Sequence, residues 1–190
     1  GSGQAESFMP TPPLDRTDSS RCVGCHSVSN SGRYMVGRLG GGDNIGAVFD
    51  LTKDLTGDPP PTEFPLANDG ANWWFSTWSP DDSRVAVSRR VPNVGDGLYV
   101  LDPTTGQFVA PQSGSLPQTN VTQPAWAPDD SLIAYVSNAN QWGSDLTQGD
   151  LSVVPVTGQD TYGSPQVLKT AAEVNNTPNA YPAGNTISYP

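Results

Sequence analysis

The residues best suited to do chemistry stand together near the start of the chain, in the segment Cys22-Val23-Gly24-Cys25-His26. This segment uses both cysteines and the single histidine of the 190-residue sequence. C-x-x-C-H is the spacing of a c-type haem attachment site, in which two thiols bond to the vinyl groups of one haem and the adjacent imidazole binds its iron. Cys22 and Cys25 are therefore predicted to hold haem c covalently, with His26 as the proximal iron ligand.

Other chemistries use the same residue types and have to be weighed against haem. Cys22 and Cys25 can form a redox dithiol or a small disulfide without any cofactor. A zinc site needs three or four protein ligands, and the sequence contains no further cysteine or histidine. A thioredoxin-like motif opens a helix, whereas no helical periodicity follows Cys25. Haem attachment is the favoured interpretation, and the disulfide stays open as the alternative.

The second axial position of the iron decides what such a haem does. A methionine ligand is typical of an electron carrier, whereas an open position permits ligand binding or peroxide chemistry. Met9 and Met35 are the two methionines of the chain. Met35 is the preferred distal ligand and Met9 the second candidate, with gap filling in the core as the other role for Met35. Tyr34 and Lys53 are further candidates.

Two arginines follow the motif closely in sequence. Because a guanidinium group binds a carboxylate in a bidentate manner, Arg33 and Arg38 are candidates to pair with the haem propionates. Solvated charge at a strand edge is the alternative role for both. No histidine remains outside the motif to act as the base of a hydrolase triad, so that class of enzyme is disfavoured.

The rest of the chain is expected to form short strands joined by turns, because it contains 20 glycines and 19 prolines and shows no 3.6-residue apolar period. Residues 78–88 (WSPDDSRVAVS) recur at an offset of 48 as residues 126–136 (WAPDDSLIAYV), and a degenerate copy occupies residues 181–189 (YPAGNTISY). Proline and aspartate favour a tight turn before each apolar strand.

This repeat resembles the blade of TolB-like, WD-repeat-like β-propellers, whose signature is Trp-Ser-Pro-Asp-Gly, two residues and Ile-Ala-Phe. Asp82 and Asp130 stand where the family usually has glycine, so each turn must tolerate an aspartate. The resemblance implies an all-β fold of four-stranded antiparallel blades. Three blades and a partial fourth are expected, at about residues 22–70, 71–118, 119–175 and 176–190. The outer strands are expected near residues 62–66, 107–110 and 165–168.

The first blade is aligned with this template by matching residues 29–36 to residues 80–87, an offset of 51. The motif then takes the place of the innermost strand, so the haem is expected on the propeller scaffold itself, in one domain of residues 22–190. At this offset Met35 matches Ala86 and Ala134, which makes it an unusually long side chain. Residues 1–21 contain several prolines and are expected to form an extended leader.

A propeller closes with four to eight blades, and the stacked faces of an open arc would stay uncovered. We therefore expect the chain to be part of a larger propeller. Self-association of the chain, or a fold that departs from the propeller, is the alternative.

Composition restricts the partners and the cell compartment. Nineteen acidic and nine basic residues give a net charge of -10, which disfavours nucleic acid and favours a redox partner with a basic surface. No apolar run reaches the roughly 20 residues that span a membrane. Because haem attachment of this kind takes place outside the bacterial inner membrane, we expect a periplasmic or extracellular protein whose signal peptide has been removed.

Three functions remain from the sequence. The leading hypothesis is a c-type cytochrome with one haem on a β-propeller scaffold, an electron-transfer protein rather than a catalyst. The second is a haem enzyme or small-ligand sensor with an open sixth iron position. The third is a non-haem propeller module that binds protein or carbohydrate and contains a Cys22–Cys25 disulfide.

Overall fold

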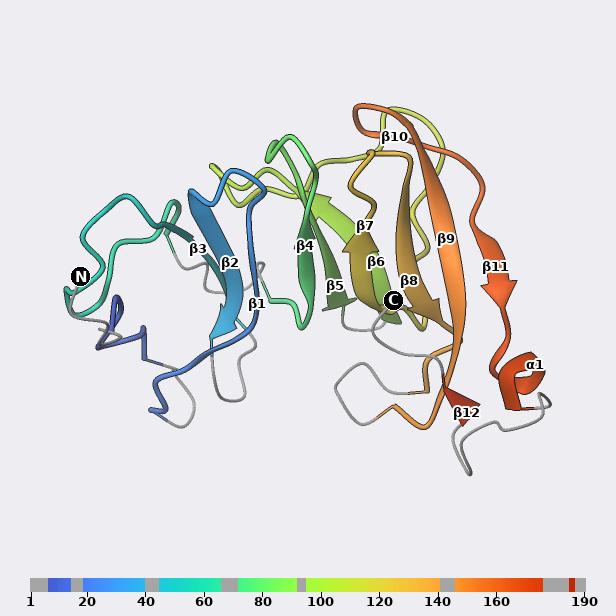
Figure 1. Ribbon diagram of the computed structural model, residues 1–190, viewed down its shortest axis with the longest axis horizontal. Coiled ribbons are helices and arrows are strands. Elements are labelled where there is room, and N and C mark those ends of the chain that lie inside the picture. Colours follow the sequence, from blue (N-terminus) through green and yellow to red (C-terminus); the bar gives the residue numbers. More distant parts are fainter. Residues whose placement is uncertain are drawn as a thin grey trace, which may run out of the picture.

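The fold is known from a computed structural model, which describes residues 7–14, 19–39, 45–65, 72–91, 95–140, 146–175 and 185–186. Three sheets, antiparallel except for the pairing of the two-residue strand at 185–186, stand side by side along the long axis of the molecule (Figure 1). Within the described residues, the only helix is the one-turn α1 (Ala171–Asn175), and no helix there is long and apolar enough to cross a membrane. The all-β prediction is confirmed.

The strands follow one another along the chain, so that each sheet is built from one continuous segment. The first sheet contains β1 (Val23–Val28), β2 (Tyr34–Leu39) and β3 (Gly46–Asp50). The second contains β4 (Ser76–Trp78), β5 (Val85–Val91) and β6 (Gly95–Leu101). The third contains β7 (Thr122–Trp126), β8 (Leu132–Ser137), β9 (Gln148–Gly158), β10 (Thr161–Tyr162), β11 (Gln166–Lys169) and β12 (Asn185–Thr186).

The first two strands of each sheet are joined by the same turn. In all three turns one residue has a positive φ: Gly32 (74°), Asp82 (61°) and Asp130 (60°). Each of these residues donates its backbone N–H to the carbonyl oxygen three residues earlier, at 2.9–3.0 Å. The predicted repeat is therefore a repeat of structure, and aspartate replaces glycine at the left-handed position in two copies, where its short polar side chain is tolerated.

The turns also correct the alignment of the first blade. Gly32 is equivalent to Asp82, so the offset between the first two blades is 50 residues and not 51. Strand pairing agrees, because Met35 lies opposite Val28 in the same way as Val85 lies opposite Trp78. Met35 thus matches Val85 and Ile133 rather than Ala86 and Ala134. A long apolar side chain is ordinary at this position.

The expected outer strands form to different extents. Residues 166–169 form β11, which pairs with β9 and completes a four-stranded antiparallel blade. In the first sheet, the expected outer strand at residues 62–66 contributes one backbone hydrogen bond, from Glu63 N to Val48 O (2.9 Å). In the second, Val109 N donates to Val100 O (2.8 Å) next to an isolated bridge. Prolines at positions 59–61, 65 and 111 lack the N–H needed for a longer ladder.

Apolar side chains join the three sheets into one stack. Val85 and Val87 of β5 pack toward the first sheet, whereas Ala86 between them packs toward the third. The other face of the first sheet is covered by leader residues, since Met9 is only 8% exposed and packs in a cluster with Met35. The described part of the leader is therefore packed on the sheet. Residues 1–6, 15–18 and most of the expected partial fourth blade lie outside the described residues.

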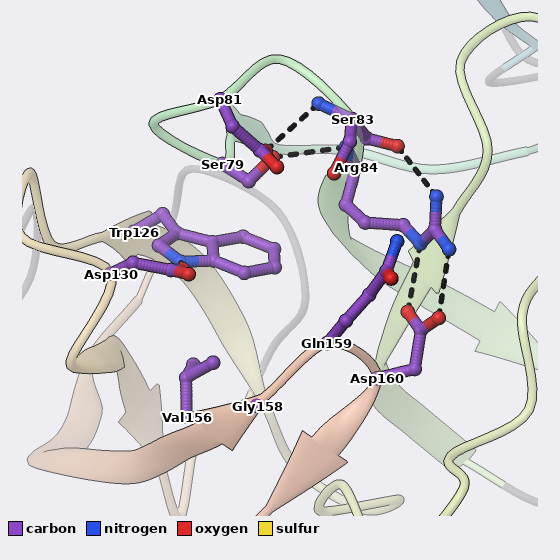
Figure 2. A pocket seen from close by; sticks show the side chains of 10 residues that line it. All are labelled: Ser79, Asp81, Ser83, Arg84, Trp126, Asp130, Val156, Gly158, Gln159 and Asp160. Atoms are coloured by element: carbon purple, nitrogen blue, oxygen red, sulfur yellow. Dashed lines mark hydrogen bonds and ion pairs between the residues drawn. The ribbon is translucent and has the colours of Figure 1, made fainter.

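The junctions between neighbouring blades also contain polar contacts. Between the first and second blades, the Asp82 carboxylate accepts the backbone N–H groups of Asn30 (2.7 Å) and Ser31 (3.0 Å). Between the second and third, Arg84 and Asp160 form a bidentate ion pair with both N–O distances at 2.7 Å. Figure 2 shows this pair at the end of a polar pocket of about 180 Å³.

Replacing Arg84 by Met is expected to lower the free energy of unfolding by about 3 kcal/mol, because it leaves the buried Asp160 carboxylate without its cation. Urea unfolding at pH 7 measures this loss. The double variant Arg84→Met with Asp160→Asn should recover part of the lost stability, since no buried charge then remains. Equal losses in the single and the double variant would show that the pair is not coupled.

Candidate haem-attachment site

The C-x-x-C-H motif lies at the edge of the first sheet. Residues 23–26 belong to β1, as predicted for the innermost strand, and Cys22 directly precedes it. β1 pairs with β2, and the register shifts between Gly24 and Ser27. Gly24 lies opposite Arg38, and Ser27 lies opposite Val36. Two residues of β1, Cys25 and His26, therefore face a single residue of β2, Gly37. This is a β-bulge, and bulges re-aim side chains.

The bulge gives the motif an uncommon backbone conformation. Cys25 has a φ of 46°, in the left-handed region where residues other than glycine are uncommon. Cys22 and His26 are exposed, Cys25 is half-buried, and both cysteines are free thiols. All three reactive groups are therefore open to a ligand that approaches the edge of the sheet.

His26 lies on the outer face of the first sheet, the face that does not contact the second sheet. A methyl group placed on Gly37, opposite the bulge, would lie 2.5 Å from Cγ1 of Val23 and 3.3 Å from Cβ of His26. Because side chains alternate along a strand, Gly37 shares its face with Met35. His26, Val23 and Met35 are thus neighbours on one face.

This outer face is apolar and contains both methionines. Met35 is 5% exposed and Met9 is 8% exposed, and they belong to one packed cluster with Val23 at its margin. The other members of the cluster are Leu39, Ile45, Ala47, Phe49, Leu51 and Leu55. The structure therefore brings both candidate distal ligands to the face that carries His26.

The two arginines predicted to pair with propionates have other partners in the structure. Arg33 forms an ion pair with Asp50 at 2.9 Å, and this carboxylate is buried. The Arg38 guanidinium lies 3.8 Å from the ring centroid of Trp74, on the face of β2 opposite to Met35. A propionate role for either arginine stays a prediction, and it would compete with these contacts.

The remaining distal candidates point elsewhere. Tyr34 stacks on Trp78 with ring centroids 5.9 Å apart, toward the second sheet. Lys53 forms an ion pair with Glu63. Sequence reasoning missed Gly37, although a glycine inside an apolar strand is a known signal for a bulge or a close approach of another group.

The donor set fits a covalently bound haem. Two free thiols and an imidazole lie at the bulge of β1 or directly before the strand, and a buried apolar cluster with Val23 at its margin lies beside them. Iron held in haem needs only one or two ligands from the protein. Among the residues that the structure describes, no group of three or more His, Cys, Asp or Glu side chains could hold a metal ion by itself.

The sheets, their order and the repeated turns define a β-propeller-type fold. TolB from Acinetobacter baumannii has a similar structure, with a TM-score of 0.53 and 13% identity over 82% of this chain and 36% of that one. Putative TolB from Agrobacterium tumefaciens has a TM-score of 0.51 and 18% identity, over 83% of this chain and 49% of that one. Kuenenia stuttgartiensis hydrazine synthase has a TM-score of 0.50 and 13% identity, over 76% of this chain and 41% of that one.

These similarities establish the fold, and the predicted TolB-like blades are confirmed at that level. The chain spans less than half the length of each of the three similar proteins. Neither a protein-family model nor a curated protein sequence matches the chain. The haem motif therefore has to be argued from its own residues.

The ion pair between Arg33 and Asp50 predicts that the free energy of unfolding depends on pH. Hydrogen bonds from Arg33 and Thr52 hold the pKa of Asp50 well below its usual range. A carboxyl group with a lowered folded pKa stabilises the protein above its unfolded pKa, near 4, and loses this contribution as the pH falls through the folded value. We expect Asp50→Asn to weaken the loss of stability between pH 5 and pH 2, as measured by urea unfolding.

Arg33→Gln is the matched control for this experiment, because it removes the main cause of the shift and leaves the carboxyl group in place. Its acid dependence should also be weaker than that of the unmodified protein. An unchanged acid dependence in both variants would contradict the assigned role of the pair.

Proposed function

We propose that this protein is a c-type cytochrome that carries one covalently bound haem on a β-propeller-type scaffold and transfers electrons. The observation that carries the proposal is the placement of the motif. Both thiols are free, with Cys25 on the bulge of β1 and Cys22 exposed directly before the strand, and His26 lies on the face of the sheet where two methionines are buried. A dithiol or disulfide alone would not require the imidazole or the apolar face.

Each residue of the motif has a separate task. Cys22 and Cys25 would hold the haem through two thioether bonds, formed by addition of each S–H across one vinyl group. His26 provides the proximal ligand, and its exposure leaves the imidazole free to turn toward the iron. The haem supplies one-electron chemistry when bound. The apolar cluster around Met35 would provide a low-polarity neighbour for such a group, and such surroundings influence a reduction potential.

Electron transfer fits the remaining residues better than catalysis does. The chain has one histidine, and the proposal uses it as an iron ligand, so no imidazole is left for proton transfer. A net charge of -10 favours a redox partner with a basic surface. A periplasmic or extracellular location agrees with this chemistry, because c-type haem is attached on the outer side of the bacterial inner membrane.

Production of the protein together with a cytochrome c maturation system tests the proposal. We expect the intact mass after denaturation to increase by one haem, because two thioether bonds survive unfolding. The double variant Cys22→Ser with Cys25→Ser should carry no covalent haem, while its far-UV circular dichroism stays that of a β protein. An unmodified protein that lacks haem and is two hydrogen atoms lighter would contain the disulfide, and the non-haem binding module would replace this proposal.

A further inference from the structure

We propose that the polar pocket between the second and third blades binds a primary ammonium group on an alkyl stem, as found in a lysine side chain or an alkylamine. The pocket has a volume of about 180 Å³ and contains the Arg84–Asp160 pair (Figure 2). It uses no residue of the haem motif, so the inference is independent of the proposed function.

The junction between the first two blades shows what this second junction lacks. There the Asp82 carboxylate accepts two backbone N–H groups from the turn of the preceding blade, at 2.7 and 3.0 Å. The equivalent carboxylate in the second junction is Asp130, and the equivalent residues of the preceding turn are Pro80 and Asp81. Pro80 has no N–H, and Asp81 adds a second carboxylate. A ligand that donates hydrogen bonds would therefore supply what the neighbouring turn does not.

Trp126 takes a different position from Trp78, its equivalent in the second blade. Trp78 is 7% exposed and donates its indole N–H to Ser27 O of the preceding blade at 3.1 Å. The Trp126 indole donates instead to Asp130 Oδ1 at 2.7 Å and is only half-buried. Figure 2 shows that this ring lines the pocket. An accessible indole face attracts a cation through the quadrupole of the ring.

The charges in the pocket favour a cation as well. The charged side chains that line it are three carboxylates, from Asp81, Asp130 and Asp160, and the guanidinium of Arg84. Both oxygens of Asp160 accept hydrogen bonds from Arg84, so these two charges neutralise each other. Asp81 and Asp130 have no cationic side chain of their own in the pocket, which therefore attracts positive charge.

The available acceptor atoms distinguish an ammonium group from other cations. Asp81 and Asp130 accept hydrogen bonds at Oδ1, so Oδ2 of each carboxylate retains acceptor capacity. A guanidinium group binds a carboxylate best through both oxygens, whereas an ammonium group is a compact charge whose three donors can reach oxygens of different residues. Among the described residues, no group of three or more His, Cys, Asp or Glu side chains could hold a metal ion. The pocket therefore suits an ammonium group best.

The size of the pocket limits the rest of the ligand. Pockets for drug-sized ligands measure about 300–1,000 Å³, whereas this one measures about 180 Å³. It therefore admits one amino-acid side chain or a small amine. Val156 and the Trp126 indole provide apolar lining for an alkyl stem.

NMR titration of the ¹⁵N-labelled protein tests the inference. Each of the five tryptophans gives one indole N–H signal, and the variant Trp126→Phe assigns the signal of Trp126. Nα-acetyl-lysine methylamide should shift this signal in a saturable manner, because the ammonium group would lie next to the carboxylate that accepts the indole N–H. The norleucine analogue has the same four-carbon stem without the charge and should cause no shift.

Asp81→Asn removes one of the two carboxylates and retains the oxygen that accepts from the backbone N–H of Ser83. Its dissociation constant should rise about tenfold, the effect of one hydrogen bond to a charged group. Asp129→Asn is the matched control, because Asp129 occupies the same position in the next turn, accepts in the same way from Ser131, and does not line the pocket. The control should bind the lysine probe as the unmodified protein does, and unchanged signals of the other tryptophans show that both variants fold.

Butylamine and a lysine-containing tripeptide distinguish the sources of the ammonium group. Tighter binding of the tripeptide supports the inference with a lysine of a protein partner as the ligand, and equal binding supports it with a free amine. The absence of a saturable shift would overturn the inference. Equal losses of affinity in Asp81→Asn and Asp129→Asn would also overturn it, because they would indicate general attraction to an acidic surface. None of these outcomes depends on whether the protein carries haem.

Discussion

The first two sheets of this protein each have two apolar faces, and the rest of the structure depends on the need to cover both. β5 shows the constraint directly, because Val85 and Val87 pack on the first sheet while Ala86 packs on the third. The middle sheet is covered by its two neighbours. The first sheet has a neighbour on one side only, and the leader with Met9 covers the other. The proposed haem site lies at this end of the stack, where the motif adjoins the leader.

The repeat was predictable from sequence because its turns depend on local chemistry. A proline followed by two aspartates marks the turn in two copies, and the structure has the same backbone at all three. The alignment from sequence shifts the first copy by one residue, because this copy lacks the proline and has Gly32 where the others have aspartate. The sequence predicts an outer strand in every blade, whereas interior prolines limit the pairing of this strand in the first two blades.

The site was predictable only in part, for a similar reason. The spacing of Cys22, Cys25 and His26 is the pattern on which the haem proposal rests, because attachment to one haem needs a short segment. The bulge depends on the pairing of β1 with β2, and the packing of Met9 depends on contacts between distant segments. No local pattern encodes either. Neither the partner of Arg33 nor that of Arg38 followed from sequence, because Asp50 and Trp74 are far along the chain.

Asp82 has a consequence for how the protein folds. A left-handed backbone costs an aspartate about 1 kcal/mol, and here two N–H donors of the preceding blade bind its carboxylate. Pro80 of the second blade has no N–H to donate to the third blade, and Asp130 instead accepts the indole N–H of Trp126 within its own turn (2.7 Å). The turn at Asp82 therefore gains two hydrogen bonds that form only when the first blade stacks on the second. The turn of the third blade receives its hydrogen bond from its own Trp126.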